Sequence, residues 1–320
     1  MSNKNWTNFI CFNDGQKQPA FTGNIISLAS SNFNNFPKTI WAVEKLDSGN
    51  KIWRWDYNSN RKLSYSNPGG SVTKLDVRFA LENGVHAPQA WGFEGQTIKY
   101  WPANAQGNGD NWINLSYPEN TFPSNSTIVD ISCSNTFGIF ILCSADGQSS
   151  IYQWKYTDIT KPYIGSWEEI FIPPSTEMPS ELRCISVADR PRVWDHWSNG
   201  LIWAVDNNGK LWGTGQYTAI RSWSWNIWLE FKKPPPISKP DDPYTSYNLL
   251  TVDAGGEQTL AAIRSDGTPL EWGSSQSGYQ FNPKLNSRGT TPNMKCVCMD
   301  EFGWDFASSD GATSLLYYIA

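Results

Sequence analysis

The stretch "IWAVDNNGKLWG", residues 202–213, sets two apolar segments on either side of a polar Asn-Asn-Gly turn. Two short strands around such a turn form a β-hairpin, because Asn and Gly accept the positive φ that tight hairpin turns need. The hairpin also carries two tryptophans, Trp203 and Trp212. The stretch therefore predicts a hairpin with large side chains, and it calls for a search for further copies.

Five other segments follow the same pattern of apolar strand, polar turn with Gly and second strand. They are "IWAVEKLDSGNKIWRW" from Ile40, "AWGFEGQTIKYW" from Ala90, "IFILCSADGQSSIYQW" from Ile139, "LAAIRSDGTPLEW" from Leu260 and "WDFASSDGATSLLYY" from Trp304. By subtraction, successive turn glycines lie 44 to 62 residues apart; they are Gly49, Gly95, Gly147, Gly209, Gly267 and Gly311. The sequence therefore contains six copies of one structural unit.

Each unit contains two further strand-like segments. One is apolar, as in "TIVDISC" and "ELRCISV", and the other pairs an aromatic with an apolar residue, as in "NWTNF", "KLSYS", "NWINL", "SWEEI", "WNIWLEF" and "YQFNPKL". Four strands per unit, repeated radially, make a β-propeller. We therefore predict an all-β, six-bladed propeller of four-stranded antiparallel blades in one domain, residues 1–320. The N-terminal segment fits either the first or the last sheet, and the N- and C-terminal strands would close the ring.

The composition agrees with short strands and turns. Charged residues make up only 17% of the 320 residues, whereas there are 18 Trp, 13 Tyr and 15 Phe. The net charge of −5, with no Lys/Arg cluster, argues against a nucleic-acid partner. The sequence shows neither an apolar run long enough for a membrane span nor a signal peptide. We therefore expect a protein that is cytoplasmic or released without a classical signal peptide.

Motifs for metal binding or catalysis are missing from the sequence. Only two histidines occur, neither near a cysteine, so we expect no metal or cofactor. Cys296 and Cys298 of "CVC" would share one strand face as small buried residues. No Gly-x-Ser-x-Gly elbow, phosphate loop or His-Glu-x-x-His occurs. A sialidase-like glycoside hydrolase remains an alternative, but we expect a protein without catalytic activity.

Most tryptophans are explained by packing between blades, since both faces of a blade touch neighbouring blades. We expect this role for Trp41, Trp53, Trp203 and Trp212. Aromatics in excess of the repeat are candidates for binding the apolar face of a sugar. The candidates are Trp194, His196, Trp197 and Asn199 in an insertion before the fourth hairpin, Trp223 and Trp225 in "RSWSWNIW", and the repeated aromatics Trp55, Trp101 and Trp154. For the repeated aromatics, and for the insertion, a core role is the competing interpretation.

The repeat also resembles known propeller families. "IWAVDNNGKLW", "IWAVEKLDSGNKIW" and "AWGFEGQTIKYW" resemble the tectonin repeat, as do "NWTNF" and "SWEEI". "VDAGGEQTLAAIRSDGTPLEWG" resembles the RCC1-type repeat instead. The tectonin resemblance implies a lectin, with glycans or glycoconjugates as partners. The RCC1-type resemblance implies the alternative of a protein–protein interaction propeller.

Overall fold

The computed structural model describes just over half of the chain. The described residues are 24–31, 39–56, 61–65, 72–82, 85–102, 112–135, 137–158, 161–170, 181–188, 201–215, 228–231, 248–254, 260–267, 269–272, 284–285, 296–299 and 316–319. All regular secondary structure within these ranges is β-strand. No helix that could cross a membrane occurs among them.

Most strands form five four-stranded antiparallel sheets, here called blades 1 to 5. Blade 1 contains β1 (Asn24–Ser31), β2 (Thr39–Lys45), β3 (Lys51–Asp56) and β4 (Arg61–Tyr65), and blade 2 contains β5 (Lys74–Glu82), β6 (Val85–Glu94), β7 (Thr97–Trp101) and β8 (Ile113–Asn114). Blade 3 contains β9 (Thr127–Ser134), β10 (Gly138–Ala145), β11 (Gln148–Tyr156) and β12 (Gly165–Ile170). Blade 4 contains β13 (Leu182–Ala188), β14 (Leu201–Asp206), β15 (Leu211–Gly215) and β16 (Trp228–Phe231), and blade 5 contains β17 (Leu249–Ala254), β18 (Leu260–Arg264), β19 (Pro269–Trp272) and β20 (Lys284–Leu285).

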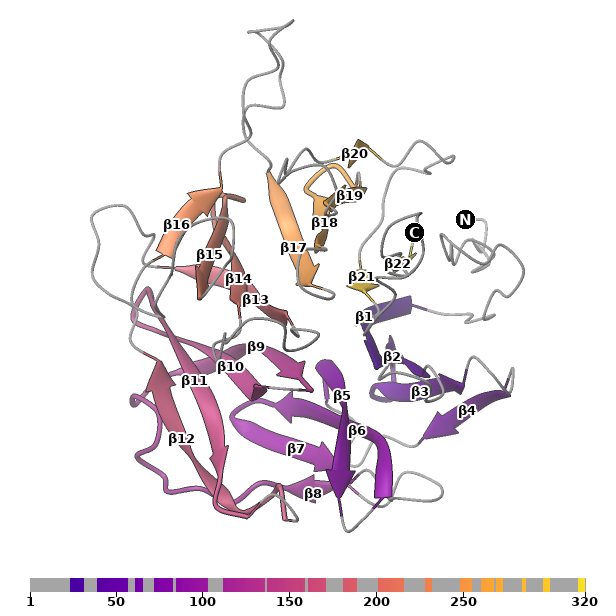
Figure 1. The fold of residues 1–320 in the computed structure, drawn as a ribbon, viewed down its shortest axis with the longest axis vertical. Coiled ribbons are helices and arrows are strands. Elements are labelled where there is room, and N and C mark those ends of the chain that lie inside the picture. Colours follow the sequence, from indigo (N-terminus) through magenta and orange to yellow (C-terminus); the bar gives the residue numbers. More distant parts are fainter. Residues whose placement is uncertain are drawn as a thin grey trace, which may run out of the picture.

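The blades are arranged radially, with the first strand of each blade innermost (Figure 1). Each of the inner strands β1, β5, β9, β13 and β17 contacts the next one in this order. This arrangement is that of a β-propeller. The order of strands within the blades also shows that the aromatic outer segment follows its hairpin as the fourth strand of the same blade.

The last described strands form a two-stranded sheet of β21 (Cys296–Met299) and β22 (Leu316–Ile319). β21 contacts both β17 and β1. The sequence predicted a hairpin from Trp304 around Gly311, and of this hairpin the structure describes only β22, which pairs with β21, Cys296 opposite Ile319. Residues 300–315 and 1–23 lie outside the described residues, so a four-stranded sixth blade and its closure by the N-terminal strand remain predictions.

The turn glycines confirm the repeat. Gly49, Gly95, Gly147, Gly209 and Gly267 all have positive φ values, between 57° and 115°, and Gly311 lies outside the described residues. A residue with a Cβ rarely adopts this conformation, which explains why a glycine recurs in every hairpin.

The core lies between the blades. Separate apolar clusters fill the junctions between blades 1 and 2, 2 and 3, and 3 and 4. Trp41, Trp203 and Trp212 are buried, as predicted. Trp53 is only partly buried, because the indole lies near the turn between β2 and β3 among charged side chains. Its Nε1 donates to Glu44 Oε2 at 2.7 Å, and the Lys51 Nζ lies 4.1 Å from the ring centroid.

Candidate functional site

Most of the predicted sugar-binding residues cannot be placed. Trp194, His196, Trp197, Asn199, Trp223 and Trp225 lie outside the described residues. Trp55 belongs to β3, opposite Ile40 of β2, but its side chain is not among those described. At these positions the predicted binding role stays a prediction.

The repeated aromatics Trp101 and Trp154 are 1% exposed each. Trp101 packs edge-on against Trp41 of blade 1, with ring centroids 5.1 Å apart. Trp154 packs against Trp167 at 5.0 Å and donates its Nε1 hydrogen to the Pro162 carbonyl oxygen at 2.8 Å. So little exposed ring leaves no face for a sugar, which favours the core interpretation of both residues.

An exposed aromatic that sequence reasoning missed lies at the junction of blades 2 and 3. Tyr163, in the turn between β11 and β12, is 38% exposed. Its ring stacks on the fully buried ring of Tyr100 of β7, with centroids 6.0 Å apart and an interplanar angle of 26°. Tyr100 packs in turn on Trp91 at 5.0 Å. The outer face of Tyr163 is thus supported from behind by a layer of buried aromatics.

Hydrogen bonds hold the turn that carries Tyr163. The Lys161 N–H donates to the Asp158 carbonyl, the Ile164 N–H donates to the Lys161 carbonyl, and the Thr157 N–H donates to the Ile164 carbonyl, each at about 3 Å. The bond from Trp154 to Pro162 attaches the same turn to the core. The ring is therefore held in place before any ligand arrives, which lowers the entropic cost of binding.

The surroundings of Tyr163 combine apolar and polar groups. Five large hydrophobic side chains are exposed in the described part of the chain. Three of them are Tyr163, its neighbour in sequence Ile164, and Ile113, whose backbone pairs with that of Tyr100 across β7 and β8. Lys161, two residues before Tyr163, is exposed as well. We call Tyr163, Ile164 and Ile113 the Tyr163 platform.

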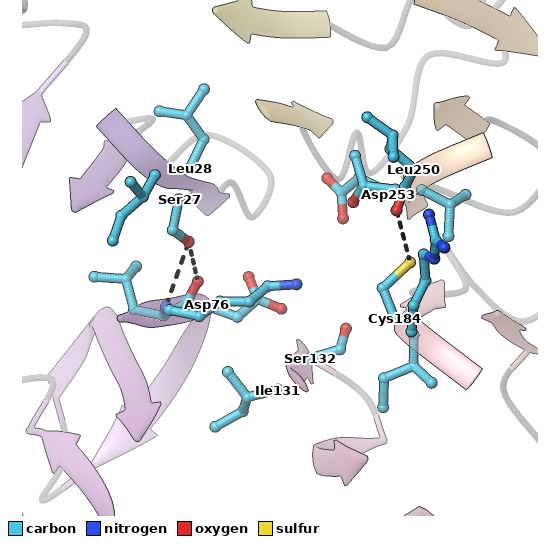
Figure 2. Close-up of a pocket in the computed structure, with 15 residues that line it drawn as sticks. Ser27, Leu28, Asp76, Ile131, Ser132, Cys184, Leu250 and Asp253 are labelled. Carbon is cyan, nitrogen blue, oxygen red and sulfur yellow. Dashed lines mark hydrogen bonds between the residues drawn. The ribbon is translucent and has the colours of Figure 1, made fainter. Parts of the chain in front are cut away.

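A second feature is a cavity of about 230 Å³ at the centre of the blades. Inner strands of all five blades line it, and polar side chains face it from each of them: Ser27 of β1, Lys74 and Asp76 of β5, Ser132 of β9, Arg183 and Cys184 of β13, and Thr251 and Asp253 of β17. Figure 2 shows Asp76 and Asp253 on opposite sides of the cavity. An aspartate flanked by apolar residues on an inner strand, as in "LDV" or "VDA", was the signal that could have found them.

Polar side chains on the inner strands also bond one blade to the next. Asp76 Oδ2 accepts the Cys133 N–H at 2.6 Å, and Asp130 Oδ2 accepts the Ile185 N–H at 2.9 Å. Ser186 Oγ accepts the Ala254 N–H at 2.9 Å and donates to Asp253 Oδ1 at 3.0 Å. These bonds satisfy backbone donors that the sheets leave unpaired, so the same residues hold the cavity wall in shape.

Burial and neighbouring charges shift the pKa values of these groups. Burial, and then the nearby Asp253 carboxylate, raise the pKa of Asp76 to about 8, although two backbone N–H groups favour its charged form. Burial raises the pKa of Asp130 above its ordinary value. Burial alone would lower the pKa of Lys74, but its ion pair with Asp130 raises it instead.

The described residues contain no group of three or more His, Cys, Asp or Glu side chains that could hold a metal ion. Cys133, Cys143 and Cys184 are buried and form no disulfide. Burial raises the pKa of Cys184 to about 11, so this thiol, which lines the cavity, stays protonated near neutral pH and is a poor nucleophile.

Comparisons with known proteins give the following. No family model matches this sequence, and no curated protein sequence matches it. Among solved structures, the chain is similar to a six-bladed propeller lectin from Aleuria aurantia described with a fucose recognition mode (TM-score 0.47, 13% identity, 83% of this chain and 80% of that one). It is also similar to SapL1 lectin in complex with α-methyl fucoside (TM-score 0.46, 11% identity, 87% and 85%). A luciferin-regenerating enzyme is equally similar (TM-score 0.47, 10% identity, 88% and 87%), and likeness at this level assigns no activity.

Proposed function

We propose that this chain is a non-catalytic, carbohydrate-binding β-propeller of six blades. The observation that carries the proposal is the Tyr163 platform, an exposed aromatic ring stacked on a buried one and fixed by hydrogen bonds from its own turn. A pyranose ring has an apolar C–H face and a rim of hydroxyl groups. It matches a flat, exposed aromatic surface such as the ring of Tyr163, and the exposed Lys161 lies two residues away in the same turn.

A broad glycan array tests the function itself. The array includes fucosylated glycans, the ligand class named for two of the compared lectins. We expect binding to a restricted set of glycans that the free sugar inhibits. A blank array at high protein concentration would overturn the proposal and leave the protein-interaction alternative.

Two variants test the platform within that function. Tyr163→Ala removes the ring and should weaken binding to the positive glycans about tenfold, whereas Tyr163→Phe keeps the stacking surface and should bind nearly as well. Leu46→Ala, which removes another exposed large hydrophobic side chain in blade 1, is the matched control and should bind like the parent. If Tyr163→Ala binds normally, the sugar lies elsewhere, and Trp197→Ala and Trp223→Ala are the next variants.

A further inference from the structure

Arg78 of β5 carries a buried positive charge at the junction of blades 2 and 3. The residue is 6% exposed; its Nε donates to Gln89 Oε1 at 2.7 Å, and its Nη1 donates to the Tyr156 hydroxyl oxygen. The Tyr156 ring also lies beside the guanidinium, with its centroid 5.1 Å from Cζ. These partners are all neutral, and no carboxylate of the described residues forms an ion pair with Arg78. Burying a charge without an opposite charge is costly, so this cation calls for an anionic partner.

Arg78 and Tyr156 both have hydrogen-bond donors to spare. Gln89 and Tyr156 take two of the five N–H groups of the guanidinium. Nη2 has no acceptor among the described residues, and it is not one of the enclosed side-chain atoms that lack a partner, so water can reach it. The hydrogen of the Tyr156 hydroxyl group likewise has no acceptor in the described part of the chain. The two side chains therefore offer adjacent donors and one positive charge.

The surrounding residues hold both groups in position. Gln89 is fully buried, and its Oε1 also accepts from Trp91 Nε1 at 2.8 Å, so the acceptor that orients Arg78 is itself fixed. A Cβ at Gly138 would lie 2.8 Å from the Tyr156 hydroxyl oxygen, so the missing side chain leaves room for the hydroxyl group beside Arg78. Donors that are in place before a ligand arrives lower the entropic cost of binding.

We propose that Arg78 and Tyr156 bind the carboxylate group of a small ligand at the junction of blades 2 and 3. A carboxylate has two oxygens, which can accept from the guanidinium N–H groups and from the phenol O–H at the same time. Its single negative charge matches the single charge of Arg78, whereas a phosphate dianion would bring a second charge that this guanidinium does not balance. The Tyr156 ring covers one face of the guanidinium, which leaves the edge that a planar carboxylate fits.

Saturation-transfer NMR with sodium acetate at constant ionic strength tests the proposal. Acetamide, which has nearly the same shape without the charge, is the control. We expect a saturable signal from the acetate methyl group with a Kd of about 1–10 mM, in keeping with the few heavy atoms of acetate, and no saturable signal from acetamide. Inorganic phosphate should displace acetate only with a weaker Kd than that of acetate itself. Equal signals from acetate and acetamide, or tighter binding of phosphate than of acetate, would overturn the proposal.

Variants locate the site. Arg78→Met removes the charge and should weaken acetate binding about tenfold or more; Gln89 still accepts from Trp91, so we expect the variant to fold, which its melting temperature checks. Lys155→Met removes an exposed cation next to Tyr156 in the chain and should leave the Kd unchanged. Parental acetate binding by Arg78→Met, or an equal loss in Lys155→Met, would contradict the assignment.

Tyr156→Phe provides a second variant that does not depend on the folding of Arg78→Met. It keeps the ring beside the guanidinium and removes the O–H donor, so acetate should bind about threefold to tenfold more weakly. An unchanged Kd would show that the hydroxyl group does not touch the ligand and would overturn the two-residue site. Binding to the glycan array should be the same for Tyr156→Phe and the parent, so failure here is distinguishable from failure of the proposed lectin function.

Discussion

Asp206 and Trp212 are joined by a hydrogen bond inside the blade 4 hairpin, where the indole Nε1 donates to Asp206 Oδ2 at 3.1 Å. The other carboxylate oxygen accepts the N–H groups of Asn208 at 2.8 Å and Lys210 at 2.9 Å, so one fully buried side chain fixes both the turn and the tryptophan. Blade 1 repeats the device with Glu44 and Trp53. In both blades, an acidic side chain at the end of the second strand accepts a hydrogen bond from a tryptophan of the third strand and so orients its ring.

Removing the Asp206 carboxylate should destabilise the fold. Asp206→Ala leaves two backbone donors and a buried indole N–H without their acceptor, and we expect a loss of about 3 kcal/mol in the free energy of unfolding. Urea denaturation followed by tryptophan fluorescence measures it. Asp47→Ala, an exposed turn residue of the blade 1 hairpin, should change stability by less than about 0.5 kcal/mol. Similar values for the two variants would show that the bonds of Asp206 contribute little.

Two turn glycines with similar φ differ in their surroundings. A Cβ at Gly209 would lie 2.8 Å from the Asn248 Cα and the Leu249 nitrogen, whereas a Cβ at Gly95 would meet nothing within 4 Å. Gly95→Ala should therefore cost only the positive-φ penalty, about 1 kcal/mol, and Gly209→Ala should cost more, because blade 5 must also shift. Urea denaturation measures both variants, and we expect the lower midpoint for Gly209→Ala. An equal or higher midpoint for Gly209→Ala would contradict the prediction.

Trp154→Ala should behave as a core mutation. The ring is 1% exposed and packs on Trp167, so its removal leaves a cavity and should cost about 3–5 kcal/mol. Its bond to Pro162 also positions the turn that carries Tyr163, so glycan binding should fall together with the melting temperature. A variant that keeps the parental melting temperature but loses glycan binding would instead make Trp154 a binding residue.

Stability should depend on pH through Asp76. Its pKa is about 8 in the fold and 3.8 at its ordinary value, so the folded chain binds the proton more tightly than the unfolded chain does. Its stabilising contribution is therefore complete below about pH 4 and is lost as the pH rises towards 8. We expect the melting temperature to fall between pH 6 and 8.5, and to fall less steeply in Asp76→Asn. Parallel curves for the two proteins would contradict the assignment.

The repeat made much of the fold predictable from sequence. Gly209 and its counterparts mark turns because their φ is positive, and Trp203 and Trp212 mark strands that pack against other blades. The two features at the candidate sites could not be found in this way. Tyr163 does not stand out from the sequence repeat, and its ring is supported by Tyr100 of another blade. Asp76 and Asp253 line the same cavity only because strands that are distant in sequence surround it.

Most of the side-chain acceptors on the inner strands of blades 1 to 4 bond to the blade that follows in the chain. Ser27, Asp76, Asp130, Ser132 and Ser186 each accept a backbone N–H from the blade that follows in the chain. The blades are therefore not interchangeable. Each blade must place a side-chain oxygen at the point along its inner strand where the next blade has an unpaired backbone N–H group. Cutting the chain in a loop between two of these blades would keep every one of these pairs. Deleting a single blade would instead bring together two inner strands whose side-chain acceptors and backbone N–H groups do not correspond.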